Sequence, residues 1–305
     1  MRPRLPIRAL GVLALCAASS GGASPPIQAT FPTPDDAANA LLTALASGNY
    51  DSFLAVAGRQ MAGFWSSGSP ERDDADREYF VETARREGLR ADRESESRTV
   101  LYIGRMGPPF PAPLVKTEAG WQFDDAAGSR ELTVRAMRRN ETAVAEQCRR
   151  FREAEFEYLA LASTGGAGFA GRIRSQPGQH DGLFWDAGNG DESPMGPLFA
   201  AAAFAERQAA DGTRPLFGYY FKILAAQGPD AAGGALDYRT NGQLRKGFAL
   251  IAWPDRYGVD GVHTFLINHF GDLYEKDLGD ATGAIAGMTA VFNPDSSWSK
   301  VDERD

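Results

Sequence analysis

Three short segments rich in aromatic and β-branched residues place the strongest constraint on the fold of this 305-residue chain. They cover residues 217–224, 247–254 and 261–268, and glycine, proline, asparagine or aspartate bounds each of them. This pattern is typical of half-buried antiparallel strands separated by turns. No nucleophile with a base, no phosphate-binding loop and no metal-ligand cluster stands at the strand ends. The segments therefore predict an antiparallel sheet, and they indicate no particular reaction or ligand.

A long helical pattern precedes these strands, from about Arg130 to Ala162. Apolar side chains recur in it at spacings of three and four residues, which places them on one helix face: Val144, Cys148, Phe151, Ala154, Tyr158 and Leu161. We expect this stripe to pack against the sheet. Cys148 is then a buried, inert thiol rather than a reactive one.

The N-terminal half combines short helices with a second group of strands. Thr33 can cap a first helix, and further helices are expected from Tyr50 and from Pro70 until Gly88. Strands are expected at residues 99–103, 113–116 and 121–123. The chain is therefore predicted to be an α+β protein with two domains, residues 33–128 and 129–305.

The first residues have the order of a secretory signal peptide. A basic start is followed by an apolar stretch at residues 9–18 and by small residues up to Ser24. The apolar stretch is shorter than the roughly 20 residues that cross a bilayer. We expect cleavage after Ala23, a proline-rich linker at residues 24–32, and a periplasmic or secreted protein with no transmembrane segment.

A lipoprotein signal at Cys16 is the alternative. The bulky Leu15 stands where lipid attachment favours a small residue, so the sequence favours simple cleavage. Cleavage leaves Cys148 as the remaining cysteine, and no intramolecular disulfide can then form.

The charge excludes nucleic acid as a partner. The formal net charge is −8, and loss of the signal arginines makes it more negative, whereas nucleic-acid binding needs a basic surface. No cofactor is expected either. Residues 166–171 have the glycine spacing of a dinucleotide-binding loop, but a helix rather than a strand precedes them.

Two pairs of residues are weak candidates for catalysis. Asp124 and Asp125 follow a predicted strand, where one of them can serve as a base, but neighbours on a strand point to opposite faces. His180 and Asp181 form a local acid–base pair, which a turn held by the Asp181 side chain explains equally well. His263 alternates with apolar residues and is expected to be a sheet histidine with its hydrogen bonds satisfied.

A glycine-rich loop gathers oxygen ligands of the kind that calcium prefers: Asp186, Asn189, Asp191 and Glu192. Their spacing does not fit the helix–loop–helix calcium motif. A weak calcium site and a solvated acidic loop both remain open.

Several segments resemble the bacterial domain-of-unknown-function family 2950 along nearly the whole chain after the signal. The resemblance is carried by residues 31–38, 109–116, 120–124 and 218–224, and by Asp277-Leu278-Gly279. It implies an exported protein and supplies no activity or site residues.

At the domain level, the N-terminal half is similar to the nuclear-transport-factor-2-like cone, which implies a curved antiparallel sheet wrapped by helices. The C-terminal half resembles the globular head of a type IV pilin or pseudopilin, which implies a long helix packed on an antiparallel sheet. In pilins, the N-terminal half of the long helix is apolar. Here a separate domain and Arg138-Arg139 occupy that position, so assembly into a pilus is not expected.

Together these features predict a cell-envelope protein that binds an envelope protein or a small ligand rather than catalysing a reaction. One alternative is a hydrolase or isomerase that uses Asp124 or Asp125 in an N-terminal pocket. Another is an accessory subunit that contacts pseudopilin-like partners through the C-terminal domain.

Export of the chain should release a soluble protein that begins at or near Ser24, because the apolar segment is short and small residues follow it. The intact mass of the exported protein measures this. Retention of Met1, or a lipid mass on Cys16, would contradict it.

Overall fold

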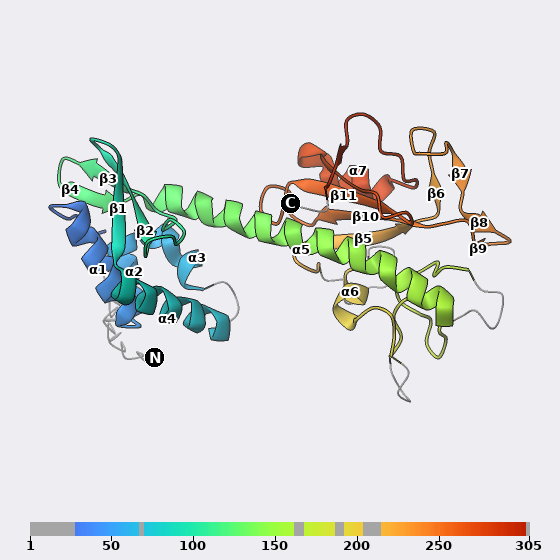
Figure 1. Cartoon of the computed structure of the whole chain (residues 1–305), viewed down its shortest axis with the longest axis horizontal. Helices are drawn as coiled ribbons and strands as arrows, with labels where there is room; N and C mark the ends of the chain where they lie inside the picture. Colours follow the sequence, from blue (N-terminus) through green and yellow to red (C-terminus); the bar gives the residue numbers. More distant parts are fainter. Residues whose placement is uncertain (1–27, 67–69, 162–167, 187–191, 204–214, 303–305) are drawn as a thin grey trace, which may run out of the picture. The chain divides into compact units, whose positions relative to one another are not determined.

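A computed structural model describes residues 28–66, 70–161, 168–186, 192–203 and 215–302. They form two compact units that divide between Asp125 and Ala126 (Figure 1). Both units combine helices with antiparallel sheets, which confirms the mixed α and β content. The signal peptide and Cys16 lie outside the described residues. The division into domains at residues 33–128 and 129–305 stays a prediction.

The helices of the N-terminal unit begin where the sequence offers caps. They are α1 (Pro34–Ala46), α2 (Tyr50–Ala57), α3 (Ala62–Trp65) and α4 (Pro70–Glu87), with a short 3₁₀ turn η1 (Arg59–Met61). The Thr33 hydroxyl accepts a hydrogen bond from the Asp36 N–H at 3.1 Å, and the Asn49 side chain caps α2 in the same way. Gly88 ends α4 in a left-handed conformation, which glycine adopts without steric cost.

Four antiparallel strands form the sheet of this unit, in the order β1 (Leu89–Ser95), β2 (Arg98–Ile103), β3 (Leu114–Thr117) and β4 (Gly120–Phe123). Sequence analysis missed β1, because its largely charged residues show no apolar alternation. In the segment expected to be a proline-rich linker, Phe31 pairs with Trp121 of β4, and each N–H donates to the other residue's carbonyl at 2.7 Å.

Aromatic side chains pack together in the interior of the N-terminal unit. The ring of Phe110 lies 5.1 Å from Phe64 and 5.4 Å from Phe123, and Phe64 also stacks on Phe53. Such pairs contribute about 0.5–1.5 kcal/mol each beyond their burial. These rings supply the core that holds the helices on the sheet.

A five-stranded antiparallel sheet dominates the C-terminal unit, in the order β13 (Ser299–Lys300), β12 (Leu273–Asp277), β11 (His263–Asn268), β10 (Ala249–Pro254) and β5 (Tyr219–Leu224). The three strands expected from the sequence are β5, β10 and β11, each within about two residues of its predicted bounds. Smaller elements are α6 (Pro197–Ala201), the two-residue strands β6 (Ala226–Gln227), β7 (Leu236–Asp237), β8 (Arg239–Thr240) and β9 (Gln243–Leu244), and η3 (Gly279–Ala281).

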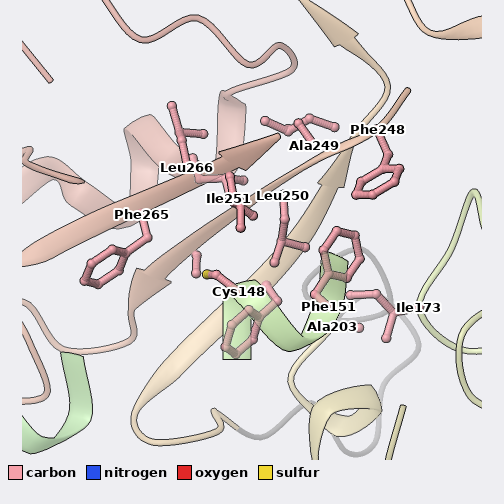
Figure 2. Close-up of a cluster of buried hydrophobic side chains, with 14 of the residues drawn as sticks. Cys148, Phe151, Ile173, Ala203, Phe248, Ala249, Leu250, Ile251, Phe265 and Leu266 are labelled. Atoms are coloured by element: carbon pink, nitrogen blue, oxygen red, sulfur yellow. The ribbon is translucent and has the colours of Figure 1, made fainter. Parts of the chain in front are cut away.

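Both faces of strand β10, which lies between β11 and the edge strand β5, are covered, because every residue of β10 is buried. The helix α7 (Thr282–Met288) packs on β10. The long helix α5 (Asp125–Leu161) contributes its apolar stripe to the same core, and Figure 2 shows Phe151 pointing from α5 toward Phe248. The sheet is thus one layer of a core that helices complete.

Two details of the long helix differ from the sequence expectation. It begins at Asp125 rather than Arg130, because Asp125 occupies the first helical turn directly after β4. The stripe is buried from Val144 to Ala154, but Tyr158 is half-buried and Leu161 is 62% exposed, so the stripe ends before the helix does.

Cys148 is fully buried, and burial raises the pKa of its thiol to about 12. In a Cys16→Ala background, a thiol reagent should therefore label Cys148 slowly in the native protein and rapidly in denaturant. Cys148→Ala should lower the free energy of unfolding by about 1 kcal/mol, and Cys148→Asp should prevent folding. Fast labelling of the native protein would contradict the burial.

Candidate functional site

Asp124 and Asp125 directly follow strand β4. The Asp124 N–H donates to the Pro113 carbonyl at 2.8 Å, and the Asp125 carboxylate accepts from the Gln60 N–H at 3.1 Å. A Cβ at Gly58 would lie 2.3 Å from the Asp125 Cβ, so the turn at Gly58 is built around that side chain. Asp125 thus holds the start of α5 to this turn, and catalysis by either aspartate stays an untested alternative.

His180 and Asp181 have different partners. The Asp181 carboxylate accepts from the Gln176 N–H at 2.8 Å and lies 3.5 Å from the Arg172 guanidinium. Burial raises the pKa of Asp181, but the hydrogen bonds from Gln176 and the charge of Arg172 outweigh it, and the net shift is downward. The His180 ring instead stacks on Trp185 at 4.4 Å. Asp181 therefore organises a turn.

His263 is a sheet histidine with a carboxylate partner. The Glu141 carboxylate on α5 accepts hydrogen bonds from the N–H groups of Val262 and His263 at 2.7 and 3.0 Å, and it lies 3.3 Å from Nδ1 of His263. These contacts attach α5 to the start of β11.

The structure describes only part of the proposed calcium loop. Asp186 and Glu192 are exposed, whereas Asn189 and Asp191 lie outside the described residues. Among the residues that the structure describes, no three histidine, cysteine, aspartate or glutamate side chains are grouped to hold a metal ion.

A cavity of about 490 Å³ lies in the C-terminal unit, between strand β5 and the segment 171–176. Its lining residues are Gly171, Arg172, Ile173, Arg174, Ser175, Gln176, Ala203, Phe221, Lys222 and Ile223. This volume falls in the range of small-molecule sites, which is about 300–1,000 Å³. Ile173 and Ala203 also belong to the core shown in Figure 2, so the cavity walls continue the core.

Local backbone pairing builds the two sides of this cavity. On one side the Phe221 N–H donates to the Ala202 carbonyl at 3.0 Å, which ties the chain after α6 to the edge of β5. On the other side, the Phe184 N–H donates to the Ile173 carbonyl and the Ser175 N–H donates to the Phe184 carbonyl, each at 2.8 Å. Residues 173–175 are therefore held to Phe184, beside the edge strand β5.

Among the residues that the structure describes, the charged side chains that line the cavity are all cationic. The Lys222 ammonium donates to the carbonyls of Ala286 and Gly287 at 3.1 and 2.7 Å, at the end of α7, and burial lowers its pKa. The Arg174 guanidinium lies 4.9 Å from the centre of the Phe184 ring. Arg172, the third cation of the lining, lies 3.5 Å from the Asp181 carboxylate.

A buried acid that sequence analysis missed lies elsewhere in the same unit. Glu155 on α5 is fully buried; one carboxyl oxygen accepts from the Ala170 N–H at 2.8 Å, and the other has no hydrogen-bond partner among the described residues. Burial raises the pKa of Glu155 well above its ordinary value, although the hydrogen bond from Ala170 opposes this. The charges of Asp181 and Glu155 also help burial to raise the pKa of Tyr158.

The Glu155 pKa predicts a pH-dependent stability. Above pH 4.5, the ordinary pKa, the unfolded chain releases the proton that the folded protein retains, so the free energy of unfolding should fall as pH rises toward the raised pKa. Glu155→Gln should remove much of this slope and stabilise the protein at neutral pH. Urea unfolding between pH 5 and 8 measures it. Glu146→Gln on the exposed face of α5 should leave the slope unchanged, and an unchanged slope in Glu155→Gln would contradict the assignment.

The described helices include none that is both long enough and apolar enough to span a membrane. Comparison with known proteins finds no matching curated protein and no matching solved structure. The likenesses to a pilin head and to the nuclear-transport-factor-2-like cone therefore stay predictions. Residues 28–301 match the family described as Protein of unknown function (DUF2950). Since this match covers most of the chain, the protein belongs to the DUF2950 family.

Proposed function

We propose that this protein is an exported, non-catalytic binding protein whose C-terminal unit holds a small ligand in the cavity beside β5. The observation that carries the proposal is the cavity itself, which has the volume of a small-molecule site and walls that extend from the core. Export is supported by the signal-like order of the first residues.

The surroundings of the candidate acids favour binding over catalysis. Asp125 and Asp181 accept hydrogen bonds from backbone N–H groups that fix local turns. Glu141 does the same for the start of β11. A carboxylate held in this way supports the fold, whereas a catalytic base must reach a substrate proton.

The accessory-subunit alternative has weaker support. It requires an apolar patch on the long helix, and Phe156 and Leu161 are 41% and 62% exposed near the end of α5. The Phe156 ring also contacts Phe169 and Phe248. Single exposed apolar side chains are normal on protein surfaces, so these two do not define a docking surface.

A neutral apolar dye tests the cavity without assuming the ligand's charge. N-phenyl-1-naphthylamine should bind the mature protein saturably at one site, with increased fluorescence. Gly171→Phe should weaken binding by about tenfold, because Gly171 lines the cavity and its substitution meets open space. Gly283→Phe on α7, which also meets open space but does not line the cavity, is the matched control.

Ile223→Phe places a second bulky side chain at the cavity wall. Circular dichroism should verify that each variant folds. Absence of saturable dye binding to the wild-type protein, or unchanged binding in both folded cavity variants, would overturn the proposed site.

A further inference from the structure

We infer that the Glu155 carboxyl group is a proton-controlled latch on the wall of the cavity beside β5: the wall is closed while the group holds its proton and opens when the proton is released. The latch acts on the stretch of chain that begins at Ala170 and continues into the lining residue Gly171. Control of a ligand by the latch rests on the proposed function, whereas the movement of the wall does not.

This stretch of the wall lies between two points of backbone attachment. Before it, the Phe169 N–H donates to the Leu244 carbonyl at 2.7 Å. After it, the Leu183 N–H donates to the Arg172 carbonyl at 3.3 Å. Residues 170 and 171 therefore form a short connection that can move while its two ends stay in place.

Glu155 holds this connection to the long helix α5. One oxygen of its carboxyl group accepts from the Ala170 N–H at 2.8 Å, and both residues are buried. Gly171 is exposed, and a Cβ there would meet open space. Because glycine has the widest choice of backbone conformations, the chain can turn outward at Gly171 at little steric cost. The hydrogen bond to Glu155 thus keeps Ala170 against α5.

The second oxygen of the Glu155 carboxyl group makes the closed wall sensitive to protonation. This oxygen has no hydrogen-bond partner among the described residues. A neutral carboxyl group leaves one polar atom unpaired, whereas an ionised one also brings a charge into the apolar interior, which is far more costly. An ionised Glu155 therefore requires hydration, and water reaches the carboxylate when Ala170 moves away.

The charged and titratable groups on α5 do not compensate an ionised Glu155. Burial raises its pKa, a hydrogen bond opposes the rise, and no described cation lowers it. The Arg152 guanidinium donates instead to the His269 carbonyl at 3.0 Å. Burial and the charges of Asp181 and Glu155 raise the pKa of Tyr158. The carboxyl group therefore faces a phenol and an acid.

Cations on the neighbouring segments have other partners as well. The Arg245 guanidinium, which follows β9, donates to the Gln243 side chain at 3.0 and 2.6 Å. The Arg172 guanidinium lies 3.5 Å from the Asp181 carboxylate. Burial thus remains the main influence on the proton of Glu155.

The direction of the pH effect follows from proton linkage. In the closed wall, burial raises the pKa of Glu155, whereas in the open wall water returns the pKa toward its ordinary value of 4.5. Between these two pKa values, opening releases one proton, so the ratio of open to closed wall rises by up to about tenfold for each unit of pH. A ligand held by the closed wall is therefore released as the pH rises.

Hydrogen exchange followed by mass spectrometry tests the latch in the mature protein. Peptides covering residues 168–173 should lose protection by at least about tenfold between pH 6 and pH 8, after correction for the exchange rate of the unfolded chain. Glu155→Gln keeps an oxygen for the Ala170 N–H and has no proton to release, so its protection should not change with pH. Glu146→Gln, on the exposed face of α5, is the matched control and should behave as the wild type.

Peptides from β10 separate movement of the wall from unfolding of the whole unit. Their protection should change less with pH than that of residues 168–173, because the latch acts locally. A parallel loss of protection in both regions would overturn the latch and leave Glu155 as a determinant of global stability. Protection of residues 168–173 that is independent of pH in the wild type, or equally dependent on pH in Glu155→Gln, would also overturn it.

N-phenyl-1-naphthylamine connects the latch to the cavity. Saturating dye should restore the protection of residues 168–173 at pH 8, and the dye should bind the wild type more weakly at pH 8 than at pH 6 but bind Glu155→Gln equally at both. A pH-sensitive wall that the dye leaves unprotected would overturn control of the ligand. Failure of the dye to bind at either pH would overturn the proposed binding function, and exchange at residues 168–173 would still decide the latch.

Discussion

The structure of the C-terminal unit depends on covering both faces of strand β10. Every side chain of β10 is buried, and neighbouring residues of a strand point to opposite faces, so one covering layer cannot be enough. The stripe of α5 and the helix α7 provide apolar partners for this strand. Burial at roughly 25 cal/mol per Å² makes this the dominant favourable contribution to folding of the unit.

The covering helices also determine where polar groups are placed. The end of α7 presents the carbonyls of Ala286 and Gly287 to Lys222, which gives a partly buried ammonium two acceptors. On α5, Glu155 lies in the core and accepts a single hydrogen bond, from Ala170. Lys222 thus has two acceptors for its ammonium. Glu155 has one carboxyl oxygen without a hydrogen-bond partner among the described residues, which is costly in an apolar interior.

The sequence predicted β5, β10 and β11 because their apolar residues are local and continuous. It did not predict β1, whose charged residues hide the strand pattern, or the two-residue strands β6–β9, which are too short for any periodicity. The family assignment was confirmed because it rested on segments spread along most of the chain. The domain likenesses rested on the order of elements alone, and no solved structure matches the chain.

Sequence analysis also missed residues of the candidate site. A signal for Glu155 was present, because it follows Phe151 by four residues and precedes Tyr158 by three, which is the spacing of the buried stripe. The stripe was instead assigned through Ala154. The cavity had no comparable signal, since Arg172 and Lys222 are far apart in sequence and only tertiary structure brings their segments together.

The position of the cavity follows from the exposed edge of β5. An edge strand presents unpaired backbone groups, which proteins protect by covering the edge or by placing charges along it. Here Ala202 covers the edge at Phe221, and the segment 171–176 lies beside it without closing the space. The cavity is therefore the part of this edge that backbone pairing leaves open.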